Sequence, residues 1–271
     1  MSAIATPMAI PGVLHVHSTY SDGEFSLREL RETLQREGCR FAGLGDHVEA
    51  FDTAKLADYL RECDDLSDAQ FWFLPGLEFE CERRIHVVGY GCTQLCAAKT
   101  VAEVITHIRC TGGVPVVAHP ADDLLDWFEN IATLPDGLEV WNSKYDGHYG
   151  PRARTFRLLR HWRARTPVLA FYGVDLHWKK QHRALRTVML GASGNRASLL
   201  DALRRGQFQG RLGEIQLPAT GDANAKWLRR ADVRNRWSQR ARRWFKRSKR
   251  VLDRFGLRIP RGLKSELRRW L

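Results

Sequence analysis

Histidine and carboxylate side chains follow short strand-like segments along much of this sequence. The segments are runs of apolar, often β-branched residues, such as 13–17 and 114–118. Six of the ten histidines and three carboxylates hold these positions: His15, His17, Asp22, His47, Glu78, His86, His119, Asp175 and His177. Imidazole and carboxylate groups suit Zn²⁺, Mn²⁺ and Fe²⁺, so these residue types point to metal chemistry.

The number of these groups argues for a metal more strongly than any one of them. A lone histidine at a strand end is more often structural than a ligand. Nine polar or charged groups buried together would cost on the order of several kcal/mol per uncompensated charge, and divalent cations offset that cost. His15 and His17 are two residues apart, as are Asp175 and His177, so we expect each pair to share one face of a strand.

The elements that must position these side chains alternate along the chain. Strands are expected near residues 13–17, 41–45, 71–74, 85–89, 114–118, 138–141, 168–172 and 186–190. Helices are expected at 27–37 after a Ser26 cap, then at 55–63, 101–109, 122–132, 152–163 and 197–204. This α/β alternation predicts a parallel sheet with crossover helices. Polar groups at the strand ends favour a barrel, whose catalytic residues collect at the C-terminal mouth.

Six motifs resemble those of the PHP (polymerase and histidinol phosphatase) domain, in the family's order. They are His15-Val-His17-Ser-Thr-Tyr-Ser21-Asp22-Gly23, Gly45-Asp46-His47, Pro75-Gly-Leu-Glu78, His86-Val-Val-Gly-Tyr90, Ala118-His119-Pro120 and Gly173-Val-Asp175-Leu-His177. This sequence departs from the family's usual motifs at three positions: the family more often has Thr where Gly45 stands, Ser where Val174 stands and Ala where Leu176 stands. None of the three is a candidate ligand. The resemblance covers about residues 12–212.

This resemblance implies a distorted (β/α)7 barrel of PHP type. It also implies a metal-dependent phosphoesterase that hydrolyses phosphate mono- or diesters by a metal-activated hydroxide. Two or three divalent ions (Mn, Zn or Fe) would be bound. By the family's grouping, His15, His17, Glu78 and Asp175 hold one metal; Glu78, His86 and His119 a second; and Asp22, His47 and His177 a third.

Other residues near the strand ends are candidates for supporting roles. Asp46, beside His47, would orient a ligand or donate a proton. Arg183, Lys144 and Arg84 follow strand ends and would bind a substrate phosphate, while Glu139 and Asn142 would line the pocket. Two other functions stay open: an amidohydrolase-like metal hydrolase, and a non-catalytic membrane- or nucleic-acid-binding module with structural metals.

The excess positive charge is confined to the last fifth of the chain. Residues 222–271 carry 18 Lys+Arg and 4 Asp+Glu, a net +14, whereas residues 1–221 carry −2. Residues 225–255 predict an amphipathic helix, and its apolar positions are Trp237, Ala241, Trp244, Phe245, Val251, Leu252 and Phe255. After Pro260, a second short helical turn would carry Leu263, Leu267, Trp270 and Leu271. We therefore expect a lead-in (1–11), a PHP-like metal-dependent barrel (12–215) and a basic amphipathic tail (216–271).

Three interpretations of this tail stay open. It would lie on an anionic membrane, bind nucleic acid, or pack partly on the barrel with its outer face solvated. No apolar run reaches the roughly 18 residues of a spanning helix, and the first residues do not resemble a secretory signal. We expect a cytoplasmic protein, free or peripheral at the membrane, whose substrate is a phosphorylated small molecule or a short nucleotide.

Overall fold

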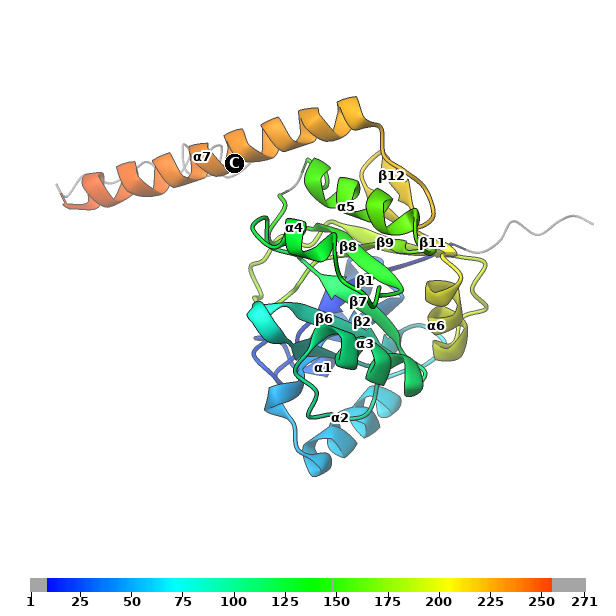
Figure 1. Cartoon of the computed structure of the whole chain (residues 1–271). Coiled ribbons are helices and arrows are strands. Elements are labelled where there is room, and N and C mark those ends of the chain that lie inside the picture. Colours follow the sequence, from blue (N-terminus) through cyan, green and yellow to red (C-terminus); the bar gives the residue numbers. More distant parts are fainter. Residues whose placement is uncertain (1–8, 148, 255–271) are drawn as a thin grey trace, which may run out of the picture.

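The fold is mixed α/β and rests on two six-stranded sheets, as a computed structural model describing residues 9–147 and 149–254 shows (Figure 1). Beyond residue 238, the described side chains are those of Arg240, Ala241 and Trp244. The first sheet has the order β12 (Ile215–Pro218), β11 (Phe208–Leu212), β10 (Arg186–Leu190), β1 (Ala9–Val16), β2 (Phe41–Leu44) and β4 (Trp72–Leu74). The second has the order β3 (Asp46–His47), β5 (Gly76–Glu80), β6 (His86–Tyr90), β7 (Val114–Ala118), β8 (Gly137–Asn142) and β9 (Leu169–Gly173).

Both sheets mix parallel and antiparallel pairs, so the expectation of a wholly parallel sheet is wrong. In the second sheet, β5 pairs antiparallel with β6, and β6 with β7. Only a short segment containing the 3₁₀ turn η2 (Glu82–Arg84) joins β5 to β6, and a connection this short cannot cross over to a parallel strand. The described strands form two sheets without closing into one barrel, so the (β/α)7 barrel stays a prediction.

The chain beyond β9 runs beside the end of β1. The Val174 N–H donates to the Leu14 carbonyl, and the His17 N–H donates to the Leu176 carbonyl, each at 3.0 Å. A parallel bridge pairs Val16 with Leu176. These bonds place the candidate ligands at the two ends of the PHP-like region side by side.

Helices lie on the outside of the strands (Figure 1). They are α1 (Leu27–Arg36), α2 (Thr53–Asp65), α3 (Val101–Cys110), α4 (Leu125–Phe128), α5 (Ala153–Arg163) and α6 (Arg196–Arg204), with the 3₁₀ turn η1 (Val48–Ala50). Ser26 caps α1 as expected, and Glu29 completes a capping box. Helix α4 is shorter than the expected 122–132, and no side chain caps its start. Strands β11 and β12 were not expected, because their polar residues and Gly210 hide the strand pattern.

The tail helix α7 (Ala225–Arg254) confirms the prediction of a long helix after residue 225. Its first part lies beside α5 and the rest projects past the body (Figure 1). The predicted positions Phe255, Leu263, Leu267, Trp270 and Leu271 lie outside the described residues. Among the described helices, none combines the length and the apolar character that crossing a membrane requires.

Candidate metal centre

His15 and His17 reach the centre from a distorted strand end. A register shift interrupts the β1–β2 pairing between Leu14 and Val16, and His15 has φ 62°. The two histidines therefore do not follow the regular alternation expected of them, although their ring centroids are 5.2 Å apart. The bulge turns the strand end toward the later loops, as bulges near functional sites commonly do.

Left-handed backbone is concentrated at this site. Five described residues other than glycine have positive φ, and three are candidate ligands: His15, His119 (26°) and Asp175 (47°). The other two, Arg83 and Arg84 (each 59°), lie beside His86 in η2. Such residues are strained and persist where the surroundings hold them in place. This distribution marks the site independently of its residue types.

Glu78 lies at the middle of the cluster and approaches five histidines. Its Oε1 is 3.2 Å from His15 Nε2, 3.0 Å from His86 Nδ1 and 3.2 Å from His119 Nε2. Its Oε2 is 3.4 Å from His17 Nε2 and 3.4 Å from His47 Nδ1. This buried carboxylate faces imidazole groups on both oxygens, a set of donors that would suit divalent cations.

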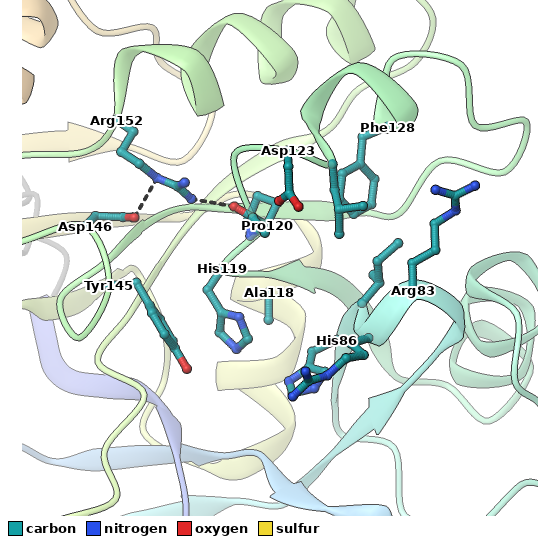
Figure 2. Close-up of a pocket in the computed structure, with 14 residues that line it drawn as sticks. Arg83, His86, Ala118, His119, Pro120, Asp123, Phe128, Tyr145, Asp146 and Arg152 are labelled. Carbon is teal, nitrogen blue, oxygen red and sulfur yellow. Dashed lines mark hydrogen bonds and ion pairs between the residues drawn. The ribbon is translucent and has the colours of Figure 1, made fainter.

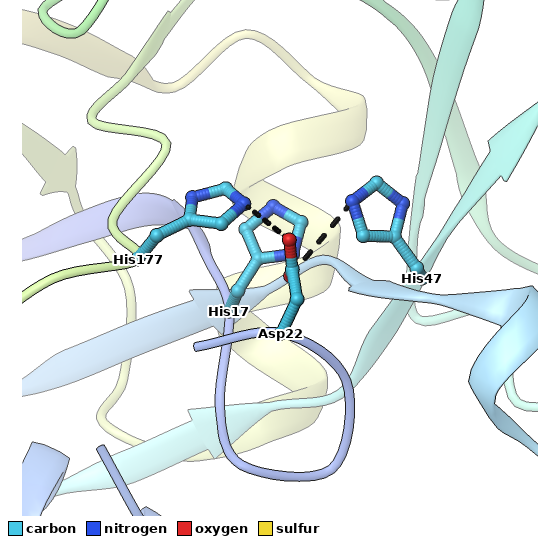
Figure 3. Close-up of side chains that lie close together, drawn as sticks. All are labelled: His17, Asp22, His47 and His177. Atoms are coloured by element: carbon cyan, nitrogen blue, oxygen red, sulfur yellow. Dashed lines mark ion pairs between the residues drawn. The ribbon is translucent and has the colours of Figure 1, made fainter. Parts of the chain in front are cut away.

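Asp22 and Asp175 complete the cluster on either side of His17. Asp22 lies 3.4 Å from His17, 3.9 Å from His47 and 3.2 Å from His177, and Figure 3 shows the three rings around its carboxylate. Asp175 Oδ1 lies 3.1 Å from His177 Nδ1 and 3.4 Å from His17 Nε2. Its Oδ2 lies 3.8 Å from His119 Nε2.

All nine candidate ligands are thus within one cluster, and their atoms form four overlapping groups. The groups are His17, Asp22, His47 and His177; Glu78, His86 and His119; His15, His17 and Glu78; and His15, His119 and Asp175. In each group the potential ligand atoms lie within 4.8 Å of one another. The first group contains Asp22, His47 and His177, which the resemblance assigned to a third metal. The second group is the set assigned to a second metal.

The unsatisfied atoms of this cluster fit bound cations. His15 Nε2, both ring nitrogens of His17 and both carboxylate oxygens of Asp175 are buried, and their closest polar contacts are ion pairs with neighbouring groups at 3.1–3.9 Å. Buried polar groups are almost always satisfied, and a divalent cation among these nitrogen and oxygen atoms would satisfy them more fully than these ion-pair contacts do. Nitrogen and carboxylate oxygen donors in this arrangement match divalent transition metals.

The electrostatics of the cluster favour ionised carboxylates. Burial raises the pKa of Glu78, but His15, His119 and His86 hold that pKa well below its usual range. Asp175 follows the same pattern, because His15, His17 and His177 outweigh its burial and lower its pKa. Burial lowers the pKa of His17, yet hydrogen bonds to Asp175 and Asp22 raise that pKa to about 9. Protons and metal ions therefore compete for this imidazole.

Glu139 supports two ligands from behind. Its Oε1 lies 3.2 Å from His15 Nδ1, and its Oε2 accepts the His119 backbone N–H at 2.8 Å and the Asn142 amide at 2.8 Å. A methyl group at Gly173 would overlap Glu139 Oε1, so a glycine is required there. The sequence pointed to Glu139 and Asn142 only as pocket-lining residues. Their part in orienting His15 and His119 depends on contacts that strand periodicity does not reveal.

Asp46 holds the turn that presents Asp22. Its carboxylate accepts the Ser18 N–H at 2.7 Å, the Ser18 hydroxyl at 3.0 Å and the Ser21 hydroxyl at 2.6 Å. Asp46 is fully buried, and burial raises its pKa. These bonds place an orienting role for Asp46 on the backbone turn that carries Asp22, and its proton-donor role stays a prediction.

The three predicted phosphate-binding cations lie in different places. Lys144 Nζ is 3.1 Å from Asp175 Oδ2 and 3.3 Å from His177 Nδ1, so it belongs to the metal centre. Arg84 lines the adjacent cavity. Arg183 pairs with Glu37 at 2.5 Å and packs over Phe25, and its contact with substrate stays a prediction.

A cavity of about 550 Å³ opens beside the ligands His86 and His119 (Figure 2). Tyr145 stacks near His119, with ring centroids 4.8 Å apart, and is half exposed. On one wall, Arg152 lies 2.7 Å from the buried Asp146, whose pKa burial raises to about 6. Arg83 and Arg84 line the side nearer His86. The cavity is therefore next to the metal ligands and bordered by guanidinium groups.

Comparison with known proteins supports the fold. No family model matches the chain. DNA polymerase/3'-5' exonuclease PolX of Bacillus subtilis is 34% identical over 79 residues, covering 26% of this chain and 14% of the polymerase. The chain thus spans only a small part of that relative.

Two solved structures share the fold. A two-domain protein of Bacteroides vulgatus, containing a predicted PHP-like metal-dependent phosphoesterase, matches with a TM-score of 0.58 and 14% identity, over 78% of this chain and 66% of that one. PsfC of Pseudomonas syringae matches with a TM-score of 0.51 and 13% identity, over 84% of this chain and 98% of that one. The resemblance to the PHP domain is confirmed at the level of the fold.

Proposed function

We propose that the protein is a metal-dependent phosphoesterase of PHP type that hydrolyses phosphate mono- or diesters. The observation that carries the proposal is the cluster of nine His, Asp and Glu side chains, whose potential ligand atoms form four overlapping groups, each within 4.8 Å. The PHP-like fold of the chain is consistent with this chemistry. The finer expectation of a (β/α)7 barrel with two or three metals belongs to the same proposal.

The positions of the residues indicate which of them would hold metal ions and which would orient those ligands. Glu78, with His86 and His119, would hold one cation; Asp22, His47 and His177 would hold another; and His15, His17 and Asp175 would complete the centre. Divalent ions bound there supply Lewis acidity and lower the pKa of water toward neutrality. Glu139 keeps the His15 ring oriented through Nδ1.

The cationic side chains of Lys144 and Arg84, next to the proposed metals, would bind the phosphate group of the substrate. Lys144 lies at the metal centre, and Arg84 borders the neighbouring cavity, so a phosphate group placed between them would contact positive charge from two sides. The rest of a small phosphorylated molecule or a short nucleotide would occupy the cavity beside Tyr145. Arg152 is committed to Asp146 and the Pro120 carbonyl, and so shapes the wall.

The test is turnover by protein of measured metal content. The full chain, loaded with Mn²⁺, Zn²⁺ or Fe²⁺, is assayed on p-nitrophenyl phosphate, on its bis-ester and on a panel of amides. We expect hydrolysis of at least one ester and none of the amides. Turnover of amides alone would favour the amidohydrolase-like alternative. Metal-loaded protein without ester turnover would contradict the proposal.

A further inference from the structure

Helix α7 has two different faces. Leu228, Ala231, Asn235 and Ser238 are buried against the body. Asn235 fixes this contact, because its side-chain amide donates to the Gly150 carbonyl at 2.9 Å and its Oδ1 accepts the Tyr149 N–H at 3.1 Å. Arg160, on α5, pairs with Asp222 at 2.7 Å just before the helix begins. The start of the helix is therefore attached to the body by one side.

The opposite side of α7 presents large apolar side chains to solvent. Val233, Trp237 and Trp244 are 59%, 70% and 71% exposed. They are four and seven residues apart, so they share one stripe of a helix with 3.6 residues per turn. Half of the six exposed large apolar residues found among the described side chains lie on this stripe. Exposure of two tryptophans on one helix face points to an interaction surface.

Cationic side chains lie on both sides of this stripe. Arg240 follows Trp237 by three residues and precedes Trp244 by four, and Arg229 precedes Val233 by four. Arg230 precedes Trp237 by seven residues, and all three arginines are exposed. The surface therefore combines tryptophans, which prefer the boundary between headgroups and acyl chains, with cations that attract anionic headgroups.

We propose that α7 binds flat on an anionic lipid bilayer through the Val233–Trp237–Trp244 stripe, with the catalytic body held on the other side of the helix. Two other partners, a second copy of the chain and a nucleic acid, fit the exposed apolar stripe and its arginines less well. A second copy of the chain would bring two strongly basic helices together. A nucleic acid would pair its phosphates with the arginines and, as a single strand, stack bases on the tryptophans, but it offers Val233 no apolar contact. A bilayer accommodates both kinds of side chain, and α7, about 45 Å long at 1.5 Å per residue, can lie along it.

The experiment is flotation of the full chain with vesicles of pure phosphatidylcholine and with vesicles containing about one third phosphatidylglycerol. We expect binding to the anionic vesicles alone, weakening as salt rises, with a blue shift of tryptophan fluorescence. Replacing both tryptophans (Trp237→Ser and Trp244→Ser) should reduce vesicle binding at least about tenfold, since each side chain loses its apolar contact. The matched control is Leu190→Ser, an exposed apolar residue on β10, which should bind like the parent.

A second pair of variants tests the charges. Reversing Arg229 and Arg240 to Glu should abolish binding, whereas reversing Arg28 and Arg211, exposed residues of the body, changes the net charge equally and should weaken binding far less. Hydrolysis of p-nitrophenyl phosphate and the circular dichroism spectrum of each variant show whether the body remains folded. The proposal is overturned if the anionic vesicles do not bind, or if binding is indifferent to both tryptophans. It is equally overturned if an oligonucleotide binds through the tryptophans and lipid does not. Because vesicle binding needs no turnover, this result stands apart from the enzymatic proposal.

Discussion

The metal centre and helix α7 both concentrate charge, but they hold it in opposite environments. At the candidate metal centre, acidic and imidazole groups gather around a buried core, and the surrounding fold holds strained backbone at His15, His119 and Asp175. On α7, arginines lie in solvent around exposed tryptophans, on a regular helix that makes little contact with the body. Charge buried by a rigid fold suits chemistry on a small group, whereas charge displayed on a helix suits attraction to an extended surface.

This comparison depends first on Glu78, the carboxylate that faces five histidines. We expect Glu78→Gln to lose metal and to reduce ester hydrolysis by more than the roughly 100-fold that marks the upper range for outer partners of a metal ligand. Metal content after dialysis and kcat/KM are the measurements. Glu214→Gln, at an exposed turn, should retain both. Unchanged metal content in the Glu78 variant would remove this residue from the metal centre.

Glu139 tests how far the candidate metal centre depends on the residues around it. It belongs to none of the four groups of potential ligands but contacts His15 and His119. Glu139→Ala should weaken metal affinity by about 10–100-fold, since the His15 ring and the His119 backbone lose their partner. Titration of the protein with Co²⁺, followed by its visible spectrum, would report both affinity and ligand geometry. Glu139→Gln retains one acceptor and should fall between the parent and the alanine variant. Identical Co²⁺ spectra and affinities for all three would exclude an orienting role.

The free energy of unfolding should depend on pH through His17 of the candidate metal centre. Folding raises the pKa of His17 from about 6.5 to about 9, because hydrogen bonds to Asp175 and Asp22 outweigh its burial. Protonated His17 therefore stabilises the metal-free fold below about pH 6.5, and this contribution, on the order of 3 kcal/mol, is lost as pH rises through about 9.

Urea unfolding in chelator across this range measures the effect. The pH dependence should shrink in His17→Gln. Metal affinity should rise over the same range, because a metal binds neutral imidazole. A metal-free parent that gains stability between pH 6.5 and 9 would contradict the assignment.

The sequence predicted these two regions to different depths. The strand-end pattern and the PHP-like motifs selected nine residues that the structure brings into one cluster, but His86 joins it from the first residue of β6, because that strand runs antiparallel to β5 and β7. The bulge at His15 was not predictable, because register depends on neighbours distant in sequence. The antiparallel β5–β6 pair was predictable, because the connection between Glu80 and His86 is too short for a crossover.

For α7, periodicity predicted a helix but could not tell which face the body covers. Asn235 and Ser238 are buried, whereas Val233 and Trp237 are exposed, the reverse of what hydropathy alone predicts. The reason is local. The loop at Tyr149 and Gly150 supplies the hydrogen bonds that Asn235 needs, and a Cβ at Gly150 (φ 146°) would press on Ala231 at 2.9 Å. Backbone contacts of this kind leave no repeating signal in the sequence.

The smallest expected effects distinguish the two faces of this helix. Asn235→Ala leaves the buried Gly150 carbonyl and Tyr149 N–H without partners, and should destabilise the docked part of α7 by about 1–3 kcal/mol. Trp237→Ala removes a larger side chain, but from solvent, and should change the free energy of unfolding by no more than about 0.5 kcal/mol. Hydrogen exchange of residues 225–238 measures the first effect locally, and urea unfolding measures both. If Trp237→Ala proved the more destabilising, the outer face would be packed in solution and could not serve as a free surface.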